Sequence, residues 1–140
     1  MNFIDRALAQ GDALTDDDLL QAMADIYQEP QVWGELDRYP RYIRDVICII
    51  DYDTELQMEG LGACADSACW EQYIQALEDC GAASEAEILR QARALADSDS
   101  DCEDETVSAG FEALSRRTAL RQDYEGFWDL VRAYIGRERG

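Results

Sequence analysis

The chain has 140 residues, 47% of them apolar, and a formal net charge of −19 from 31 acidic and 12 basic residues. This length and apolar content predict a single folded domain over residues 1–140 and argue against a disordered chain. Every basic residue is arginine, because the sequence contains neither Lys nor His. These absences exclude catalytic sites built on His or Lys, and the charge predicts repulsion from nucleic acid and anionic membranes. We therefore expect a cationic partner.

The N-terminal residues do not form a signal-peptide pattern, and no stretch approaches the roughly 20 apolar residues of a membrane span. We therefore expect a cytoplasmic protein without a membrane segment. The five cysteines include one close pair, Cys64 and Cys69, and no second pair that could complete a metal site. The run Asp97–Asp101 begins like a calcium loop, but Cys102 and Ser108 stand where Gly and Glu are required. We expect reduced thiols, no metal and no cofactor.

The pattern of the first part of the chain predicts one clear helix, followed by a turn or short helix. The helix begins after Thr15 as N-cap, with acidic residues at its positive end and one apolar face formed by Leu19, Leu20, Met23, Ile26 and Tyr27. Pro30 and Pro40 then bracket a turn or short helix around Trp33 and Leu36.

The segment from Arg41 to Met58 fits two structures. Its β-branched run, Val46 to Ile50, suits a buried strand, and its apolar spacing also suits a long buried helix. No other segment could pair with such a strand, and a lone strand would leave its backbone groups unsatisfied. We therefore predict a helix.

Helical spacing continues to the end of the chain. One helix runs from Trp70 to Cys80 and ends at Gly81, and the next begins at Ser84 with Glu87 completing a capping box. The buried positions predicted for the last three helices are Ile88, Leu89, Ala92 and Leu95; Val107, Phe111, Leu114 and Thr118; and Tyr124, Phe127, Trp128, Val131 and Ile135. Gly136 is expected to stop the last helix, and the acidic run 97–105 is expected to be a solvated loop. The result is an all-α domain of six or seven helices.

Three stretches resemble the DNA-mimic protein family, which consists of small acidic bacterial proteins. They are Glu55-Leu56-Gln57-Met58-Glu59-Gly60-Leu61, Ala76-Leu77-Glu78-Asp79-Cys80-Gly81-Ala82 and Ala86-Glu87-Ile88-Leu89-Arg90-Gln91-Ala92. The resemblance covers residues 39–135 and leaves helices of residues 1–38 outside it. Met58 and Glu59 depart from the family, which has Asn and Gly at these positions.

The resemblance implies a helical protein that forms a homodimer and presents carboxylates to a DNA-binding protein. It also implies that Glu55 is a buried structural acceptor that caps local backbone amides, and that Gly60 and Gly81 have structural roles. Fold alone does not carry the DNA-mimic function over to this chain.

The acidic residues are unevenly distributed, since residues 1–35 carry −7 and residues 71–105 carry −9, while residues 106–140 carry +1. Carboxylates four residues apart on a helix stand about 6 Å apart, so they could replace a row of phosphates. The partner-binding residues predicted on this basis are Asp16, Asp17, Asp18, Glu71, Glu78, Asp79, Glu85, Glu87, Asp97, Asp99, Asp101, Glu103, Asp104 and Glu105. The alternative interpretation is that these residues only form a solvated, charged surface.

The sequence favours a non-catalytic module that binds a basic DNA-binding protein and covers its nucleic-acid surface. An alternative is an immunity or antitoxin-like protein that neutralises a cationic toxin with the same acids. A more remote alternative is an enzyme that uses carboxylates alone.

Overall fold

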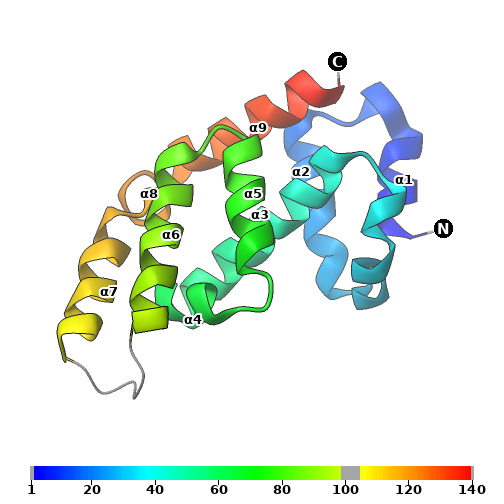
Figure 1. Ribbon diagram of the computed structural model, residues 1–140. Helices are drawn as coiled ribbons and strands as arrows, with labels where there is room; N and C mark the ends of the chain where they lie inside the picture. Colours follow the sequence, from blue (N-terminus) through cyan, green and yellow to red (C-terminus); the bar gives the residue numbers. More distant parts are fainter. Residues whose placement is uncertain (1, 99–104, 140) are drawn as a thin grey trace.

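The computed structural model describes residues 2–98 and 105–139, and every regular element in them is helical (Figure 1). These residues form nine α-helices and three 3₁₀ helices, more than the six or seven helices expected. In chain order they are α1 (Phe3–Gln10), η1 (Gly11–Ala13), α2 (Asp16–Met23), η2 (Ala24–Tyr27), η3 (Pro30–Arg38), α3 (Arg41–Met58), α4 (Leu61–Asp66), α5 (Trp70–Asp79), α6 (Ala83–Ser98), α7 (Glu105–Arg117), α8 (Ala119–Gln122) and α9 (Tyr124–Arg139). The extra helices are short ones, such as η1, α4 and α8.

The N-terminal helices begin with capping boxes. Thr15 Oγ1 accepts a hydrogen bond from the Asp18 amide at 3.0 Å, and the Asp18 carboxylate accepts one from the Thr15 amide at 3.2 Å. The predicted cap at Thr15 is therefore confirmed. The predicted apolar face is wrong at Tyr27, whose side chain is 46% exposed. The chain tightens to a 3₁₀ helix after Met23, which shifts the helical register and leaves Tyr27 outside the core.

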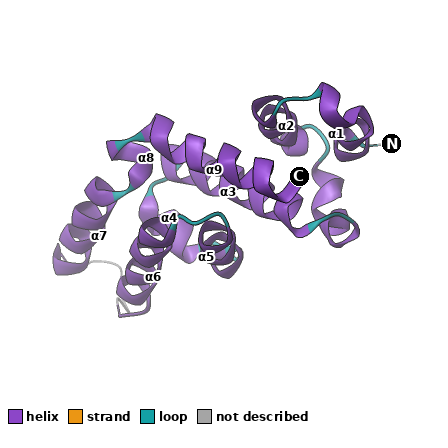
Figure 2. Ribbon diagram, turned by 90° about the horizontal axis from the view of Figure 1, so that it is seen from above, coloured by secondary structure: helices purple, strands orange, loops and turns teal. Residues whose placement is uncertain are grey.

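Helix α3 is the centre of the fold and confirms the helical prediction for Arg41–Met58. It packs against α2, α4, α5, α9, η2 and η3. Helix α9 runs along α3 in both ribbon views, and the α5–α6 pair lies beside them (Figures 1 and 2). Because α3 has neighbours around most of its circumference, its side chains are buried on several faces, as its dense apolar run predicts.

Two predicted helix boundaries are wrong. Helix α6 begins at Ala83, because the Ala86 amide already donates to the Ala82 carbonyl at 3.0 Å, so Ser84 lies inside the helix. Helix α9 continues through Gly136 to Arg139. A Cβ at Gly136 would lie 2.8 Å from Asp16 Oδ2, so this glycine makes room for α2 instead of ending α9.

One hydrophobic cluster extends from Phe3 to Ile135 and takes side chains from both the N-terminal and the C-terminal helices. Three polar residues are buried in the described part of the chain, namely Asp45, Glu85 and Thr118. Within that same part, no helix has the length and apolar character needed to cross a membrane.

Candidate functional site

The acids at the start of α2 lie against the C-terminal half of α9. Arg132 Nε lies 2.7 Å from Asp17 Oδ1, and Arg139 Nη1 lies 2.9 Å from Asp16 Oδ1. Asp18 is occupied by the cap of Thr15. These three predicted contact residues therefore have intramolecular partners, and two arginines offset part of their charge.

The acids of the α5–α6 pair are also partly neutralised. Glu78 and Glu87 both form ion pairs with Arg90, the second at 3.3 Å. Asp79 is half-buried, and its Oδ2 lies 2.9 Å from Arg41 Nε. Since Arg90 is itself exposed, Glu78 and Glu87 still face solvent.

Glu85 is not a surface residue, and its predicted role in partner binding is wrong. Its side chain is 1% exposed, and its carboxylate accepts hydrogen bonds from the Tyr52 hydroxyl and the Ala119 amide, each at 2.7 Å. Burial raises the pKa of Glu85, and this effect is larger than the opposite effect of the two hydrogen bonds, which lower the pKa. The sequence did contain a signal for this, because Glu85 precedes Ile88 and Leu89 by three and four residues on the buried stripe of α6.

Tyrosine hydroxyls bind several of the carboxylates. Asp51 accepts hydrogen bonds from Tyr27 at 2.8 Å and from Tyr73 at 2.5 Å. The other pairs of this kind are Tyr39 with Asp5, Tyr52 with Glu85, Tyr124 with Asp53 and Tyr134 with Asp45. Local sequence patterns do not indicate these pairs, because each pair joins segments that are far apart in the chain.

Asp45 is the most deeply buried acid of α3. It accepts a hydrogen bond from the Tyr134 hydroxyl at 2.6 Å. Burial raises the pKa of Asp45 to about 7; the Tyr134 hydroxyl lowers it, and the neighbouring Asp79 raises it further. Near neutral pH, Asp45 is therefore protonated in a large part of the molecules.

The turn between α3 and α4 passes through Gly60, which has a φ of 96°. The role predicted for Glu55 is wrong. Its side chain is half-buried, and its backbone carbonyl, rather than its carboxylate, accepts hydrogen bonds from the amides of Glu59 and Gly60. Gly81, at a φ of 94°, ends the segment after α5 as predicted.

The cysteines of the described residues are free thiols. Cys48, Cys64 and Cys80 are buried, and Cys69 is half-buried. Burial raises the pKa of Cys48 and Cys64 to about 12 and that of Cys80 to about 11. These three thiols are therefore protonated at neutral pH.

A group of acids remains at one end of the molecule, where the end of α3, α4, the start of α5 and the end of α6 meet (Figure 1). We call this group the acidic corner, and its residues are Glu59, Asp66, Glu71 and Asp97. All four are exposed, and within the described part of the chain only Asp97 has an ion pair, with Arg93 at 3.2 Å. Arg93 also donates to the Ala65 carbonyl at 2.8 Å, which fixes it against the end of α4.

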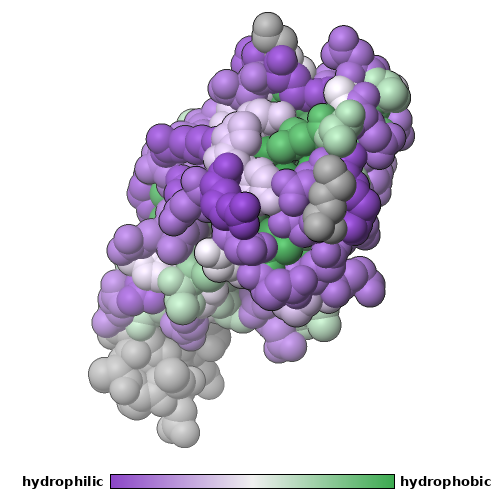
Figure 3. All heavy atoms as spheres, turned by 90° about the vertical axis from the view of Figure 1, so that its right-hand side faces the viewer, coloured by the Kyte–Doolittle hydropathy of each residue, from purple (hydrophilic) through white to green (hydrophobic). Residues whose placement is uncertain are grey.

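The face that includes the N-terminal helices is mainly hydrophilic, with a few apolar residues visible between them (Figure 3). Of the remaining predicted contacts, Glu105 begins α7, and Asp99, Asp101, Glu103 and Asp104 lie outside the described residues.

A protein-family model described as DMP19-like protein matches residues 37–137, from the end of η3 to the last turn of α9. It corresponds to the DNA-mimic family that the sequence resembles over residues 39–135. No curated protein and no solved structure matches the chain.

Proposed function

The chain belongs to the DMP19-like protein family, and we propose from this that it is an acidic module that occupies the nucleic-acid-binding surface of a basic DNA-binding protein. The family match supports a DNA-binding protein as the partner, and the net charge of −19 supports a partner with a positively charged surface. No catalytic step is part of this proposal, and the module acts by binding alone.

The acidic corner is the observation that favours one particular surface as the site of contact with the partner. Glu59, Asp66 and Glu71 are exposed and have no arginine partner in the described part of the chain. In contrast, arginines offset the acids of α2 and the flank of the α5–α6 pair. A basic surface that approaches the corner therefore meets carboxylates that are free to pair with it.

Helix geometry favours the same corner. Asp66 lies at the C-terminal end of α4 and Glu71 in the first turn of α5, so both project from helix ends at a sharp change of chain direction. Among the predicted contacts, Glu71 and Asp97 belong to the corner, where only Asp97 pairs with an arginine in the described part of the chain, whereas Glu78, Asp79 and Glu87 all pair with arginines outside it. We propose that the corner makes the main contact and that the other exposed acids add long-range attraction.

The test is capture of partners from a lysate of the source cells at low salt, followed by elution with duplex DNA. We expect a basic DNA-binding protein that DNA displaces and whose affinity falls steeply as salt rises. The double variant Asp66→Asn with Glu71→Gln should weaken this binding about tenfold. Its control, Asp12→Asn with Glu125→Gln, removes the same charge from exposed acids elsewhere and should leave the affinity within about twofold.

The other outcomes contradict the proposal in different ways. If the captured protein is a cationic enzyme that DNA does not displace, the immunity or antitoxin-like function replaces it. If both double variants weaken binding equally, the corner has no special role and only the overall charge acts. Light scattering of the purified chain tests the associated proposal that it forms a homodimer.

A further inference from the structure

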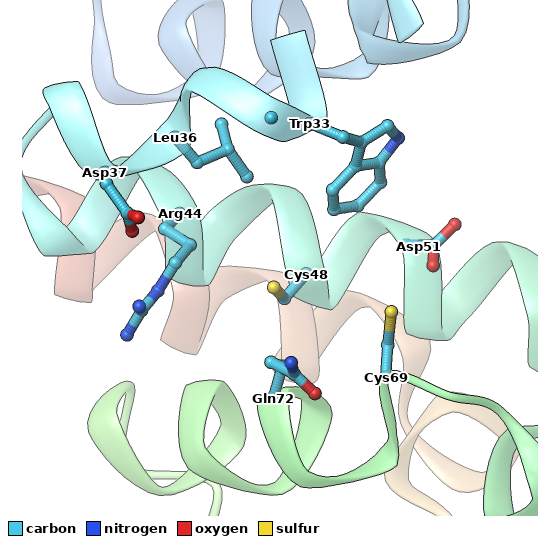
Figure 4. Close-up of a pocket in the computed structure, with 9 residues that line it drawn as sticks. Trp33, Leu36, Asp37, Arg44, Cys48, Asp51, Cys69 and Gln72 are labelled. Carbon is cyan, nitrogen blue, oxygen red and sulfur yellow. The ribbon is translucent and has the colours of Figure 1, made fainter. Parts of the chain in front are cut away.

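A cavity of about 560 Å³ lies between η3, α3 and the start of α5. Figure 4 shows Trp33 and Leu36 of η3 on one side, Cys69 and Gln72 on the opposite side, and Arg44, Cys48 and Asp51 along α3 between them. The volume is within the range of about 300–1,000 Å³ that is typical of pockets for small molecules. The cavity plays no part in the proposed function described above.

Arg44 sets the chemistry of this cavity. Eight of the arginines have a carboxylate partner within 4 Å in the described part of the chain. Of those without one, Arg117, Arg121 and Arg137 are exposed to water, whereas Arg44 is half-buried and lines the cavity. A partly desolvated guanidinium without a carboxylate partner is unusual in a chain with 31 acids. A bound anion would supply the missing negative partner.

The rest of the lining limits what that anion can be. Trp33 and Leu36 offer apolar surface, and the buried Cys48 adds to it. Asp37 and Asp51 lie at opposite ends of the lining in Figure 4, so a ligand with several negative charges would be repelled. The carboxylate of Asp51 is held by the hydroxyls of Tyr27 and Tyr73, so it does not turn away from the cavity freely.

We propose that this cavity binds a small organic monocarboxylate with an apolar or aromatic body. The carboxylate pairs with Arg44, whose planar guanidinium can donate two parallel hydrogen bonds to it. The body lies against Trp33 and Leu36. Gln72, an exposed residue of α5, borders the same space and can donate a further hydrogen bond from its amide.

Three probes that share a phenyl ring separate charge from shape. They are 3-phenylpropionate, which carries only a carboxylate, phenethylamine, which carries only an ammonium group, and phenylalanine, which carries both. Titration of the full-length, ¹⁵N-labelled chain by NMR follows the indole N–H of Trp33 directly. We expect saturable shifts of this signal with 3-phenylpropionate and none with phenethylamine, and phenylalanine reports whether an added ammonium group is tolerated beside Asp37.

Substitution of Arg44 tests the assigned contact. Arg44→Met keeps the length of the side chain and removes its charge, and we expect at least tenfold weaker binding of 3-phenylpropionate. The control Arg117→Met makes the same charge change at an exposed arginine and should leave binding within about twofold. A second pair keeps the test valid if Arg44→Met does not fold: Gln72→Glu should weaken binding, whereas Gln91→Glu on the exposed face of α6 should not.

Three results would overturn the proposal. The first is the absence of any saturable shift with 3-phenylpropionate, and the second is equal binding of phenethylamine. The third is unchanged affinity in Arg44→Met or, if that variant is unfolded, in Gln72→Glu.

Discussion

Tyrosine hydroxyls hold five of the carboxylates of this chain in place. Six of the seven tyrosines donate to an Asp or Glu, and most of these bonds join different helices. A hydrogen bond to an ionised carboxylate is stronger than one between neutral groups, and it lowers the cost of bringing that carboxylate out of water. Part of the negative charge therefore stabilises contacts between helices and is not available to a partner.

The Glu85 carboxylate gives the clearest test of this role. Glu85→Ala leaves the Tyr52 hydroxyl and the Ala119 amide without their acceptor in a buried place. We expect the free energy of unfolding to fall by about 3 kcal/mol, measured by urea denaturation. Glu87→Ala, at an exposed position two residues on, should cost less than about 0.5 kcal/mol. Equal losses in both variants would contradict the structural role of Glu85.

Asp45 predicts a pH dependence of stability. Its pKa is raised to about 7 in the folded chain, from an ordinary value of 3.8. Between about pH 4 and pH 7 the folded state thus binds a proton that the unfolded state has released, so the contribution of Asp45 to stability is lost as the pH rises through this range. Asp45→Asn cannot ionise and should gain about 2–3 kcal/mol over the unmodified chain between pH 5 and pH 8.

Denaturant unfolding of both chains at the two pH values measures this difference. The exposed control Asp12→Asn should show a change below about 0.5 kcal/mol over the same range. A constant difference between Asp45→Asn and the unmodified chain would show that Asp45 is ionised throughout.

At the scale of the elements, the turn from α3 to α4 depends on the backbone of Gly60. Its φ of 96° is unfavourable for any residue with a Cβ, although a Cβ there would meet open space. Gly60→Ala should therefore lower the free energy of unfolding by about 1–2 kcal/mol through backbone strain alone. Gly34→Ala also adds a Cβ in open space, but without a positive φ, so thermal unfolding should show no loss of stability there.

Local patterns predicted the elements that local interactions determine. The cap at Thr15 and the end at Gly81 follow from residues within one or two turns, whereas the helix over Arg41–Met58 also required that no other segment could pair with a strand there. Gly136 and Glu85 could not be predicted in this way. The first depends on the approach of Asp16 from the other end of the chain, and the second on hydroxyl and amide donors more than thirty residues away.

For the whole molecule, the sign of the charge was evident from composition, but the location of unpaired charge was not. The N-terminal acids are separated from Arg132 and Arg139 by more than a hundred residues of sequence, so only the fold brings them together. The acidic corner likewise combines acids of residues 59–71 with Asp97, which lies in a separate part of the chain at the end of α6. The sequence could name Glu71 and Asp97 as candidates, but it could not distinguish them from Glu78 and Glu87, which share an arginine.

The net charge of −19 also predicts how the chain responds to salt. Salt screens the repulsion among the excess carboxylates, and it also weakens the exposed ion pairs, each of which contributes little. Repulsion is the larger effect, so the midpoint of thermal unfolding should rise between 0.05 M and 0.5 M NaCl. A midpoint that falls with salt would show that the ion pairs dominate instead.

The last turns of α9 connect the two ends of the chain. Arg139 donates to the carbonyls of Gly11 and Leu14 and pairs with Asp16, while Arg132 pairs with Asp17. Residues 2–36 lie outside the family match, yet these contacts fasten them to its final helix. Removing the last few residues should therefore detach the segment that contains η1 and the start of α2 from α9. Protease cleavage near η1 would be the earliest sign of this local detachment.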